Sequence, residues 1–393
     1  MTSFGHAPGR AARKTARRAA RRAARAAVAL LIVAVVAGAL LSASHRRPPA
    51  LAGRPALLRT PAPHPKKVKK AHRLAGRARA GTPPVPGPAQ AGAASPLSLA
   101  VEPAAGPRPV YALLRSARRS VELEIYELDD DQATALLAAD AARGVRVRVL
   151  LDGHYVRRIN TPAYSYLRDH GVGVRWAPAH FAVAHEKAIV VDHRRAAIMT
   201  MNLTARYYTS SRDFLAFDRD PADVAAIHAT FDNDWTNGGL PPASPADLVW
   251  SPGAQDALVA LIASARHTLL VENEEMDDSA VVHALQAAAR RGVGVEVVMT
   301  RQSDWASSFS ALAQTGVAVR TYGASAPLYI HAKAIVVDPG APHARVFLGS
   351  QNFSVASLLY DRELGVVSAR PALVAAVAAV IRRDGAGATA WQP

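Results

Sequence analysis

The sequence contains two matching stretches, His185-Glu-Lys-Ala-Ile-Val-Val-Asp192 and His331-Ala-Lys-Ala-Ile-Val-Val-Asp338. In each, a histidine and a lysine two residues apart precede an apolar β-branched run, which is typical of a buried strand. Residues two apart on a strand share a face, so histidine and lysine point the same way. The aspartate lies seven positions from the histidine, an odd step that turns it to the opposite face. We therefore interpret Asp192 and Asp338 as structural residues at the strand ends.

Each stretch is followed by an asparagine and then by a carboxylate. The first copy has Met199-Thr200-Met-Asn202 and later Arg212-Asp213, and the second has Gly349-Ser350-Gln-Asn352 and later Arg362-Glu363. A histidine, a fixed lysine charge (Lys187 or Lys333) and an amide donor together suit a phosphate group. Two such sets that face each other supply a nucleophile and a proton donor on opposite sides of phosphorus, as in-line displacement requires.

The repeat extends well beyond these stretches. Residues Ser116–Asp130 are echoed by Ser264–Asp278, and both copies continue into an Ala-rich helical segment that ends at Gly144 or Gly292. Glycine is common directly after a helix end, and an apolar run typical of a strand follows in each copy. Alternating helices and strands predict an α/β fold of two homologous domains, each a mixed sheet flanked by helices. We place these domains at 98–244 and 245–393.

The first hundred residues differ in character from the rest. Eight basic residues between Arg10 and Arg25 precede an uncharged apolar run, Ala26–Ala43. This pattern fits a signal peptide or a signal anchor over 1–44, and the sequence leaves the two open. Residues 45–97 are rich in Pro, Ala and basic side chains without periodicity, and they predict a disordered linker. On these grounds we expect an exported protein, either secreted or anchored by the N-terminal segment.

The charge of the chain is concentrated in this N-terminal part. The net charge is +16, from 47 Lys and Arg against 31 Asp and Glu, but residues 1–100 hold 19 of the basic residues and no acidic one. The remaining 28 basic residues are balanced by the 31 acidic ones, so the body lacks the basic excess of a nucleic-acid cleft. The chain has no cysteine, which excludes disulfides, thiolate nucleophiles and cysteine-ligated zinc.

The duplicated His-x-Lys-x4-Asp and Gly-Ser-x-Asn patterns resemble the signature of the phospholipase D superfamily. The resemblance implies two α/β domains about a pseudo-two-fold axis with one active site at their seam, and a reaction that needs neither metal nor cofactor. It implies a covalent phosphohistidine, with His185 as the nucleophile and His331 as the acid and base. The residues that it implies for holding the phosphate or orienting a histidine are Lys187, Lys333, Asn202, Asn352, Asp213 and Glu363.

The first copy departs from the family pattern. Met199-Thr200 replaces Gly-Ser, and Asp213 replaces the commoner glutamate. Because threonine keeps the hydroxyl of Ser350, we expect a working but reshaped half-site, narrowed by the Met199 side chain. Several further residues are candidates near the site, either as buried partners or as cleft-lining aromatics, with ordinary packing as the alternative. They are Glu124, Glu272, Tyr207, Tyr208, Trp305 and Tyr329.

Three functions are compatible with these residues. The leading hypothesis is a phosphodiesterase acting on membrane phospholipids, by phospholipase D hydrolysis or by phosphatidyl transfer, as a monomer at a membrane surface. The alternative is an exported endonuclease of the same superfamily, which the basic tail favours and the near-neutral body disfavours. The third is a degenerate lipid- or polyanion-binding module, which the intact His-Lys pairs and asparagines disfavour.

Overall fold

The computed structural model describes residues 96–238, 244–300 and 303–392, which belong to one compact unit. The candidate signal segment 1–44 and nearly all of the predicted linker 45–97 lie outside the described residues. The boundary that we predicted between the two domains falls beside residues 239–243, which are also not described.

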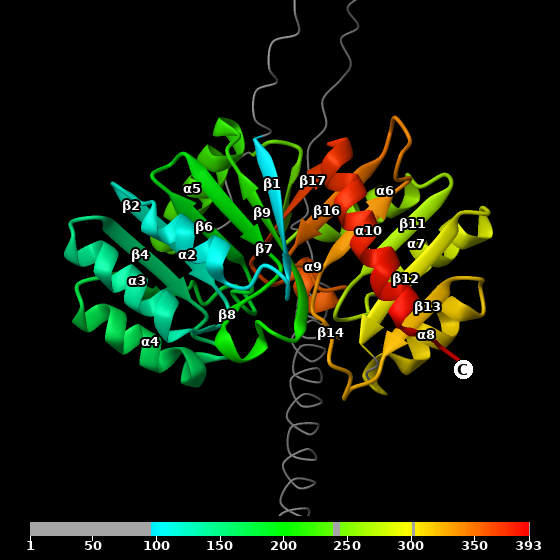
Figure 1. Ribbon diagram of the computed structural model, residues 1–393, viewed down its shortest axis with the longest axis horizontal. Coiled ribbons are helices and arrows are strands. Elements are labelled where there is room, and N and C mark those ends of the chain that lie inside the picture. Colours follow the sequence, from blue (N-terminus) through cyan, green and yellow to red (C-terminus); the bar gives the residue numbers. More distant parts are fainter. Residues whose placement is uncertain (1–95, 239–243, 301–302, 393) are drawn as a thin grey trace, which may run out of the picture. The chain divides into compact units, whose positions relative to one another are not determined.

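The described residues form two mixed eight-stranded sheets, which are shown at left and right of Figure 1. The first half of the chain supplies seven strands of the first sheet, and the eighth is a short strand of the second half. The first sheet runs in the order β1 (Leu97–Glu102), β9 (Ser211–Asp218), β7 (Arg195–Met199), β6 (Lys187–Val191), β2 (Ser120–Ile125), β4 (Arg146–Leu151) and β5 (Gly173–Trp176). The second runs β10 (Leu248–Ser251), β17 (Glu363–Ser368), β16 (Arg345–Gly349), β15 (Ala334–Val337), β11 (Thr268–Glu272), β12 (Gly294–Thr300), β13 (Ala318–Tyr322) and β18 (Thr389–Ala390). The first seven strands of each sheet correspond in order.

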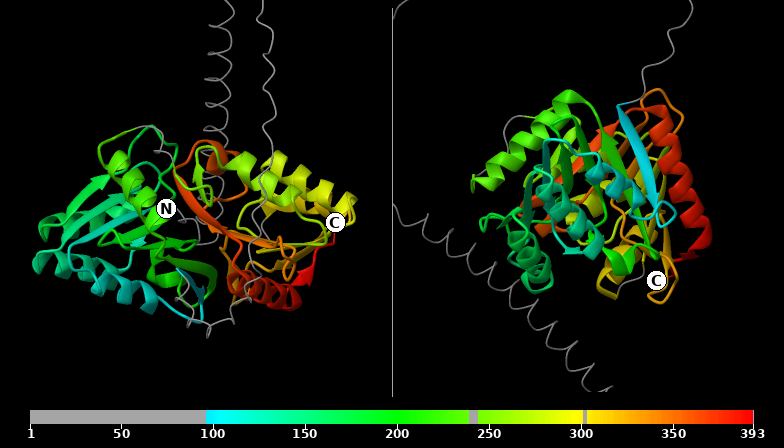
Figure 2. Two further views of the ribbon diagram at one scale, coloured as in Figure 1. Left: turned by 90° about the horizontal axis from the view of Figure 1, so that it is seen from above. Right: turned by 60° about the vertical axis from the view of Figure 1, so that its left-hand side comes forward.

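Helices flank both sheets (Figure 2). In the first half they are α2 (Arg108–Arg115), α3 (Asp131–Ala142), α4 (Arg157–Asp169) and α5 (Pro221–Trp235). In the second half they are α6 (Ala254–Ala263), α7 (Ser279–Arg290), α8 (Ala306–Ala313), α9 (Val355–Leu359) and α10 (Pro371–Gly387). A short pair of strands, β3 (Leu128–Asp129) and β8 (Leu203–Thr204), completes the first half.

Matching sequence signals start and stop the matching helices α3 and α7. Asp130 accepts hydrogen bonds from backbone N–H groups in the first turn of α3, and Asp278 does the same for α7. Gly144 and Gly292 follow the two helices with the same positive φ of 88°, a conformation that costs glycine little. The predicted helix ends and the predicted α/β class with two similar halves are confirmed.

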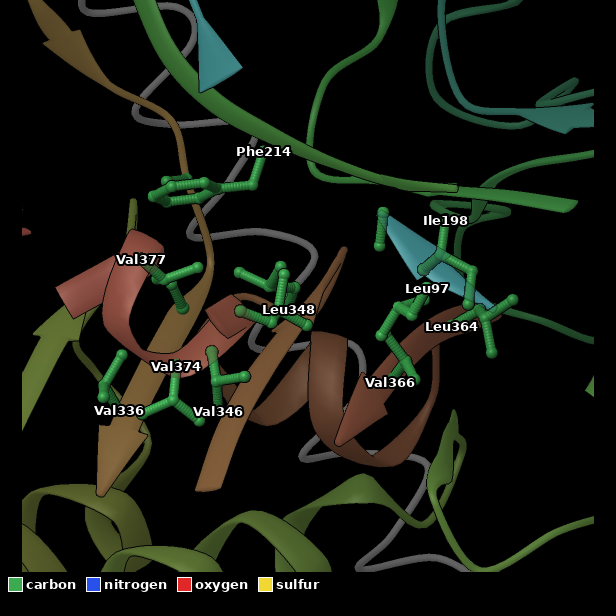
Figure 3. Packing of buried hydrophobic residues seen from close by; sticks show 14 of the residues in the cluster. Leu97, Ile198, Phe214, Val336, Val346, Leu348, Leu364, Val366, Val374 and Val377 are labelled. Carbon is green, nitrogen blue, oxygen red and sulfur yellow. The ribbon is translucent and has the colours of Figure 1, made fainter. Parts of the chain in front are cut away.

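Three apolar cores hold the described part of the chain together. One lies within each half, and the third is shared by residues of both. Figure 3 shows the shared core, in which Leu97, Ile198 and Phe214 of the first half face side chains of β15, β16, β17 and α10. Burial of this apolar surface favours association of the two halves, which places their matching strands next to one another.

Candidate active site

Short strand pairs cross between the halves beside both histidines. β14 (Tyr329–Ile330) of the second half pairs in parallel with β9 of the first. The His331 backbone N–H then donates to the Arg212 carbonyl at 3.2 Å, and the His185 N–H donates to the Arg362 carbonyl at 2.9 Å. Each histidine therefore lies next to the Arg-carboxylate pair of the opposite half. Both precede their strands, because β6 begins only at Lys187 and β15 only at Ala334.

Each histidine contacts the carboxylate of the other half through its Nδ1 atom. His185 Nδ1 lies 3.2 Å from Glu363 Oε1, and His331 Nδ1 lies 2.8 Å from Asp213 Oδ1. A carboxylate on Nδ1 fixes the ring orientation and directs Nε2 at a reaction partner. The two imidazole side chains keep exposures of 12% and 14%, so they remain accessible from solvent. The two half-sites are completed by each other.

Hydroxyl groups hold both carboxylates in place. Thr200 Oγ1 donates to Asp213 and also accepts the Phe214 backbone N–H at 2.9 Å. In the second half Ser357 Oγ donates to Glu363 at 2.5 Å, the Ser350 side chain also hydrogen-bonds Glu363, and Ser350 Oγ accepts the Leu364 N–H at 3.2 Å. Threonine thus serves the shorter aspartate directly.

Met199 does not shape the substrate pocket. Its side chain is fully buried among the apolar residues of the first half's own core. Our expectation that it narrows the site is therefore wrong. The apolar side chain is explained by its position on β7, where alternate residues point into that core.

Both motif lysines are buried within the site. Lys187 Nζ donates to the His185 carbonyl at 2.5 Å, and Lys333 Nζ donates to the His331 carbonyl at 2.6 Å. Lys333 Nζ also donates to Glu274 Oε2 at 3.0 Å, whereas Lys187 Nζ lies 5.1 Å from the centre of the Tyr126 ring. Each lysine keeps donor capacity for an anion beyond these contacts.

The electrostatics of the first half favour a neutral histidine. Burial lowers the pKa of His185 well below its usual value, and the charges of Lys187, Lys333 and His331 lower it further. Burial also lowers the pKa of Lys187 to about 7. Glu363 has a pKa well above the usual carboxyl value, mainly because it is buried. His185 is therefore unprotonated near neutral pH, the state that a nucleophilic imidazole needs.

The two asparagines retain unused hydrogen-bonding capacity. Asn202 follows β7 and Asn352 follows β16, and in both the side-chain Oδ1 is buried without a hydrogen-bond partner. Buried polar atoms are normally paired, and an amide oxygen accepts, so these atoms are consistent with a ligand that supplies a donor such as a hydroxyl group.

The motif aspartates lie away from the histidines and secure the strand ends. Asp192 accepts hydrogen bonds from the N–H groups of Arg118, Arg119 and Ser120. Asp338 accepts them from the N–H groups of 266–268, the turn into β11. The odd step along the strand thus agrees with the observed direction of both side chains.

The two glutamates and four aromatic residues that the sequence analysis named as further candidates have different surroundings. Glu124 and Glu272 are fully buried, and burial raises the pKa of each. They lie beside buried Arg-Asp pairs of the seam, where Arg362 and Arg212 are among the charges that act on them. The aromatic candidates divide as follows: Tyr208 is buried on Asp130, Tyr207 is exposed, Trp305 donates to the Glu274 carbonyl, and Tyr329 donates to the Glu274 carboxylate.

Sequence reasoning missed Glu274, which contacts the second histidine. Glu274 Oε2 lies 3.5 Å from His331 Nε2. The corresponding residue of the first half, 148 positions earlier, is Tyr126, whose ring packs edge-on against His185 at 4.7 Å between ring centres. The signal was present as a mismatch inside the repeat, but nothing in the sequence alone distinguishes it from ordinary divergence.

Within the described ranges, one group of side chains has the spacing of a metal site. It consists of Glu122, His193 and His228. Arg148 already donates to Glu122 Oε1 at 2.5 Å, and its positive charge opposes a cation there. We interpret the group as a polar network between β2 and α5.

The family of the chain follows from its sequence match. A family described as "Cardiolipin synthase, PLD-like domain" matches it twice, over residues 110–235 and 258–384. The chain belongs to this phospholipase D-like family. The two matched segments contain both histidines and both crossed carboxylates, so the resemblance drawn from the motifs is confirmed.

Curated relatives of this phospholipase D-like chain include two cardiolipin synthases. Cardiolipin synthase B of Salmonella typhimurium is 24% identical over 243 residues, which cover 50% of this chain and 57% of the relative. Cardiolipin synthase A of Erwinia tasmaniensis is 27% identical over 307 residues, which cover 64% and 61%. The chain thus spans about three fifths of the length of these relatives.

A solved structure shares the fold. Phosphatidylserine synthase of Haemophilus influenzae superposes with a TM-score of 0.61 at 13% identity, covering 76% of this chain and 88% of that one. At such low identity the likeness supports the two-domain architecture alone.

The prediction of an exported protein is wrong. It rested on the composition of 26–43 and its basic flanks, and it is overturned by the likeness to bacterial cardiolipin synthases. In the part of the chain that the structure describes, we find no helix with the length and apolar character needed to cross a membrane.

Proposed function

We propose that the protein is a phosphatidyltransferase that exchanges the head-group alcohol of a phospholipid through a phosphohistidine on His185. The observation that carries this proposal is the crossed pairing of each histidine with the carboxylate of the other half. It supports a single site with two imidazoles, in which a carboxylate of the opposite half engages the Nδ1 atom of each ring.

The first step uses the two histidines in different protonation states. His185 Nε2 attacks phosphorus, and a nitrogen–phosphorus bond forms as the bond to the head-group oxygen breaks. The proton on His331 Nε2 passes to that oxygen, so the head group leaves as a neutral alcohol. Lys187 and Lys333 offset the charge on the phosphoryl oxygens. The Nδ2 groups of Asn202 and Asn352 would donate hydrogen bonds to the same oxygens.

The second step reverses the roles. His331, now neutral, takes a proton from the acceptor alcohol, whose oxygen attacks phosphorus while the bond to His185 breaks. Water as the acceptor gives hydrolysis, and a lipid alcohol gives transfer. The names of the curated relatives favour transfer with cardiolipin as the product. Two molecules of phosphatidylglycerol, one as donor and one as acceptor, would yield one cardiolipin and one glycerol.

The test uses the full chain with phosphatidylglycerol vesicles in EDTA. We expect cardiolipin and free glycerol in equal amounts from the wild type. His185→Asn should abolish both products, and His331→Asn should slow them by about 100- to 10,000-fold, the usual contribution of a general acid. Formation of phosphatidic acid in place of cardiolipin would show that the protein hydrolyses the phospholipid and does not transfer its phosphatidyl group.

The intermediate is tested with phosphatidylglycerol labelled in its phosphate. After denaturation at alkaline pH, where phosphohistidine survives, label should remain on the wild type and on His331→Asn, and be absent from His185→Asn. Label on His185→Asn would overturn the assignment of the nucleophile. Cleavage of oligonucleotides but not of phospholipid would overturn the proposed function as a whole.

A further inference from the structure

The two half-sites differ in the group that faces each histidine. In the first half Tyr126 presents a ring edge to His185, and burial raises the pKa of the Tyr126 hydroxyl, so this neighbour carries no charge. In the second half the equivalent residue, Glu274, presents a carboxylate to His331. This difference adds one negative charge beside His331 that has no counterpart at the equivalent position beside His185.

Glu274 is held firmly in that position. Tyr329 OH donates to Oε1 at 2.8 Å, Lys333 Nζ donates to Oε2 at 3.0 Å, and Oε2 lies 3.5 Å from His331 Nε2. Burial raises the pKa of Glu274, but Lys333 and His331, together with the hydrogen bonds to the side chain, outweigh it and bring the pKa to about 2. The side chain is thus an anion near neutral pH.

The charged groups around the two histidines differ in sign. His331 lies between two carboxylates, Asp213 at Nδ1 and Glu274 at Nε2, so each of its ring nitrogens faces an acceptor for an N–H. His185 has one buried carboxyl partner, and the nearby charges of Lys187, Lys333 and His331 disfavour a further positive charge. The charge distribution separates the two rings into a proton donor and a nucleophile.

We propose that Glu274 is a positioning residue that holds the proton on His331 Nε2, and that it thereby makes His331 the acid and leaves His185 as the nucleophile. The proposal rests on the proposed phosphatidyl transfer. In the first step the proton leaves His331 for the head-group oxygen. In the second step the proton of the acceptor alcohol returns to His331, and Glu274 stabilises the imidazolium again.

The first test measures the proton on His331 and needs no turnover. In the full chain with ¹⁵N-labelled histidines, the His331 resonance is assigned by its loss in His331→Asn and titrated in wild type and Glu274→Gln. Loss of a carboxylate beside Nε2 should lower the His331 pKa by about one unit or more. Glu275→Gln, the same change one residue further along at a side chain that hydrogen-bonds Ser354, should leave it in place.

The second test separates the acid role from a structural one. Glu274→Gln should slow transfer from phosphatidylglycerol about 100-fold, because the departing glycerol oxygen must be protonated as its bond to phosphorus breaks. Phosphatidyl-p-nitrophenol has a leaving group that needs little protonation, so its rate should fall less than about fivefold. Glu274→Asp should recover part of the lost rate.

Each outcome has a definite meaning. An unchanged His331 pKa in Glu274→Gln, equal losses with both substrates, or faster transfer from phosphatidylglycerol would overturn the role of Glu274. In the last case the carboxylate would be a competitor of the substrate phosphate. A lowered His331 pKa in a protein that transfers no phosphatidyl group would instead overturn the proposed function and leave the effect of Glu274 on His331 standing.

Discussion

At the scale of single residues, Thr200 stands where the second half has Ser350, and its hydroxyl fixes a carboxylate of the site. Its hydroxyl donates to Asp213 and accepts the Phe214 N–H, and the side chain is fully buried. Thr200→Val keeps the shape but leaves a buried N–H without its partner. We expect a loss of about 1–3 kcal/mol in the free energy of unfolding and a lower rate, because the carboxylate behind His331 loses its anchor. Urea unfolding and transfer assays measure the two effects.

Thr200→Ser is the matched control, since it restores the hydroxyl that the second half has at Ser350. It should stay within about 1 kcal/mol of the wild type and retain most of the activity. A Thr200→Val variant as active and as stable as Thr200→Ser would show that the hydroxyl is dispensable. The motif spacing was enough to single out this hydroxyl, but that it holds the carboxylate of the opposite half's histidine depends on contacts between strands far apart in sequence.

At the scale of elements, Asp338 joins the end of β15 to the turn before β11. Its carboxylate accepts three backbone N–H groups at 2.7–2.8 Å and a hydrogen bond from His343 Nε2. Burial opposes ionisation, but these hydrogen bonds outweigh it and lower the pKa from 3.8 to about 2. A depressed pKa contributes stability above pH 4 that is lost as the pH falls toward 2. Asp338→Asn should therefore cost about 2 kcal/mol at pH 7, and much less at pH 3, by urea unfolding.

Asp192→Asn provides the parallel case in the first half, where three N–H groups also lower the pKa of the carboxylate. Both variants should keep the activity of the wild type per folded molecule, and a large fall in kcat at unchanged stability would make the motif aspartate catalytic. The odd step from His331 predicted the direction of this side chain. The start of the strands was not predictable, because the backbone at His185 pairs with Arg362 of the other half.

At the scale of the whole molecule, the duplication predicted two similar domains, the family resemblance implied one site at their seam, and the structure adds how the two halves interlock. Arg212 and Arg362, 150 residues apart, each precede the carboxylate that crosses to the other histidine. Their guanidinium groups also cross, to Asp384 on α10 and Asp234 on α5. These aspartates are again 150 residues apart. This spacing shows that the two aspartates are equivalent positions of the repeat, but it does not show which arginine each of them contacts. The pairing across the seam therefore required the structure.

The buried pair Arg362–Asp234 offers the sharpest test of this interlocking. The guanidinium Nε lies 2.7 Å from Asp234 Oδ2, and both side chains are completely buried. Asp234→Asn leaves the arginine charge without its counterion, and we expect it to cost about 3–5 kcal/mol in urea unfolding. The double variant Arg362→Met with Asp234→Leu buries no charge and should be more stable than Asp234→Asn alone.

The double variant also separates stability from catalysis. The carboxylate of Glu363 follows Arg362 directly in the chain, so loss of the arginine anchor should loosen the partner of His185 even where apolar packing restores the fold. We expect the double variant to fold but to transfer the phosphatidyl group more slowly, measured as kcat at saturating phosphatidylglycerol. A double variant with full activity would mean that the strand pairing at Arg362 and the shared apolar core suffice to place Glu363. Costs that simply add in the double variant would mean that the two charges do not act on each other.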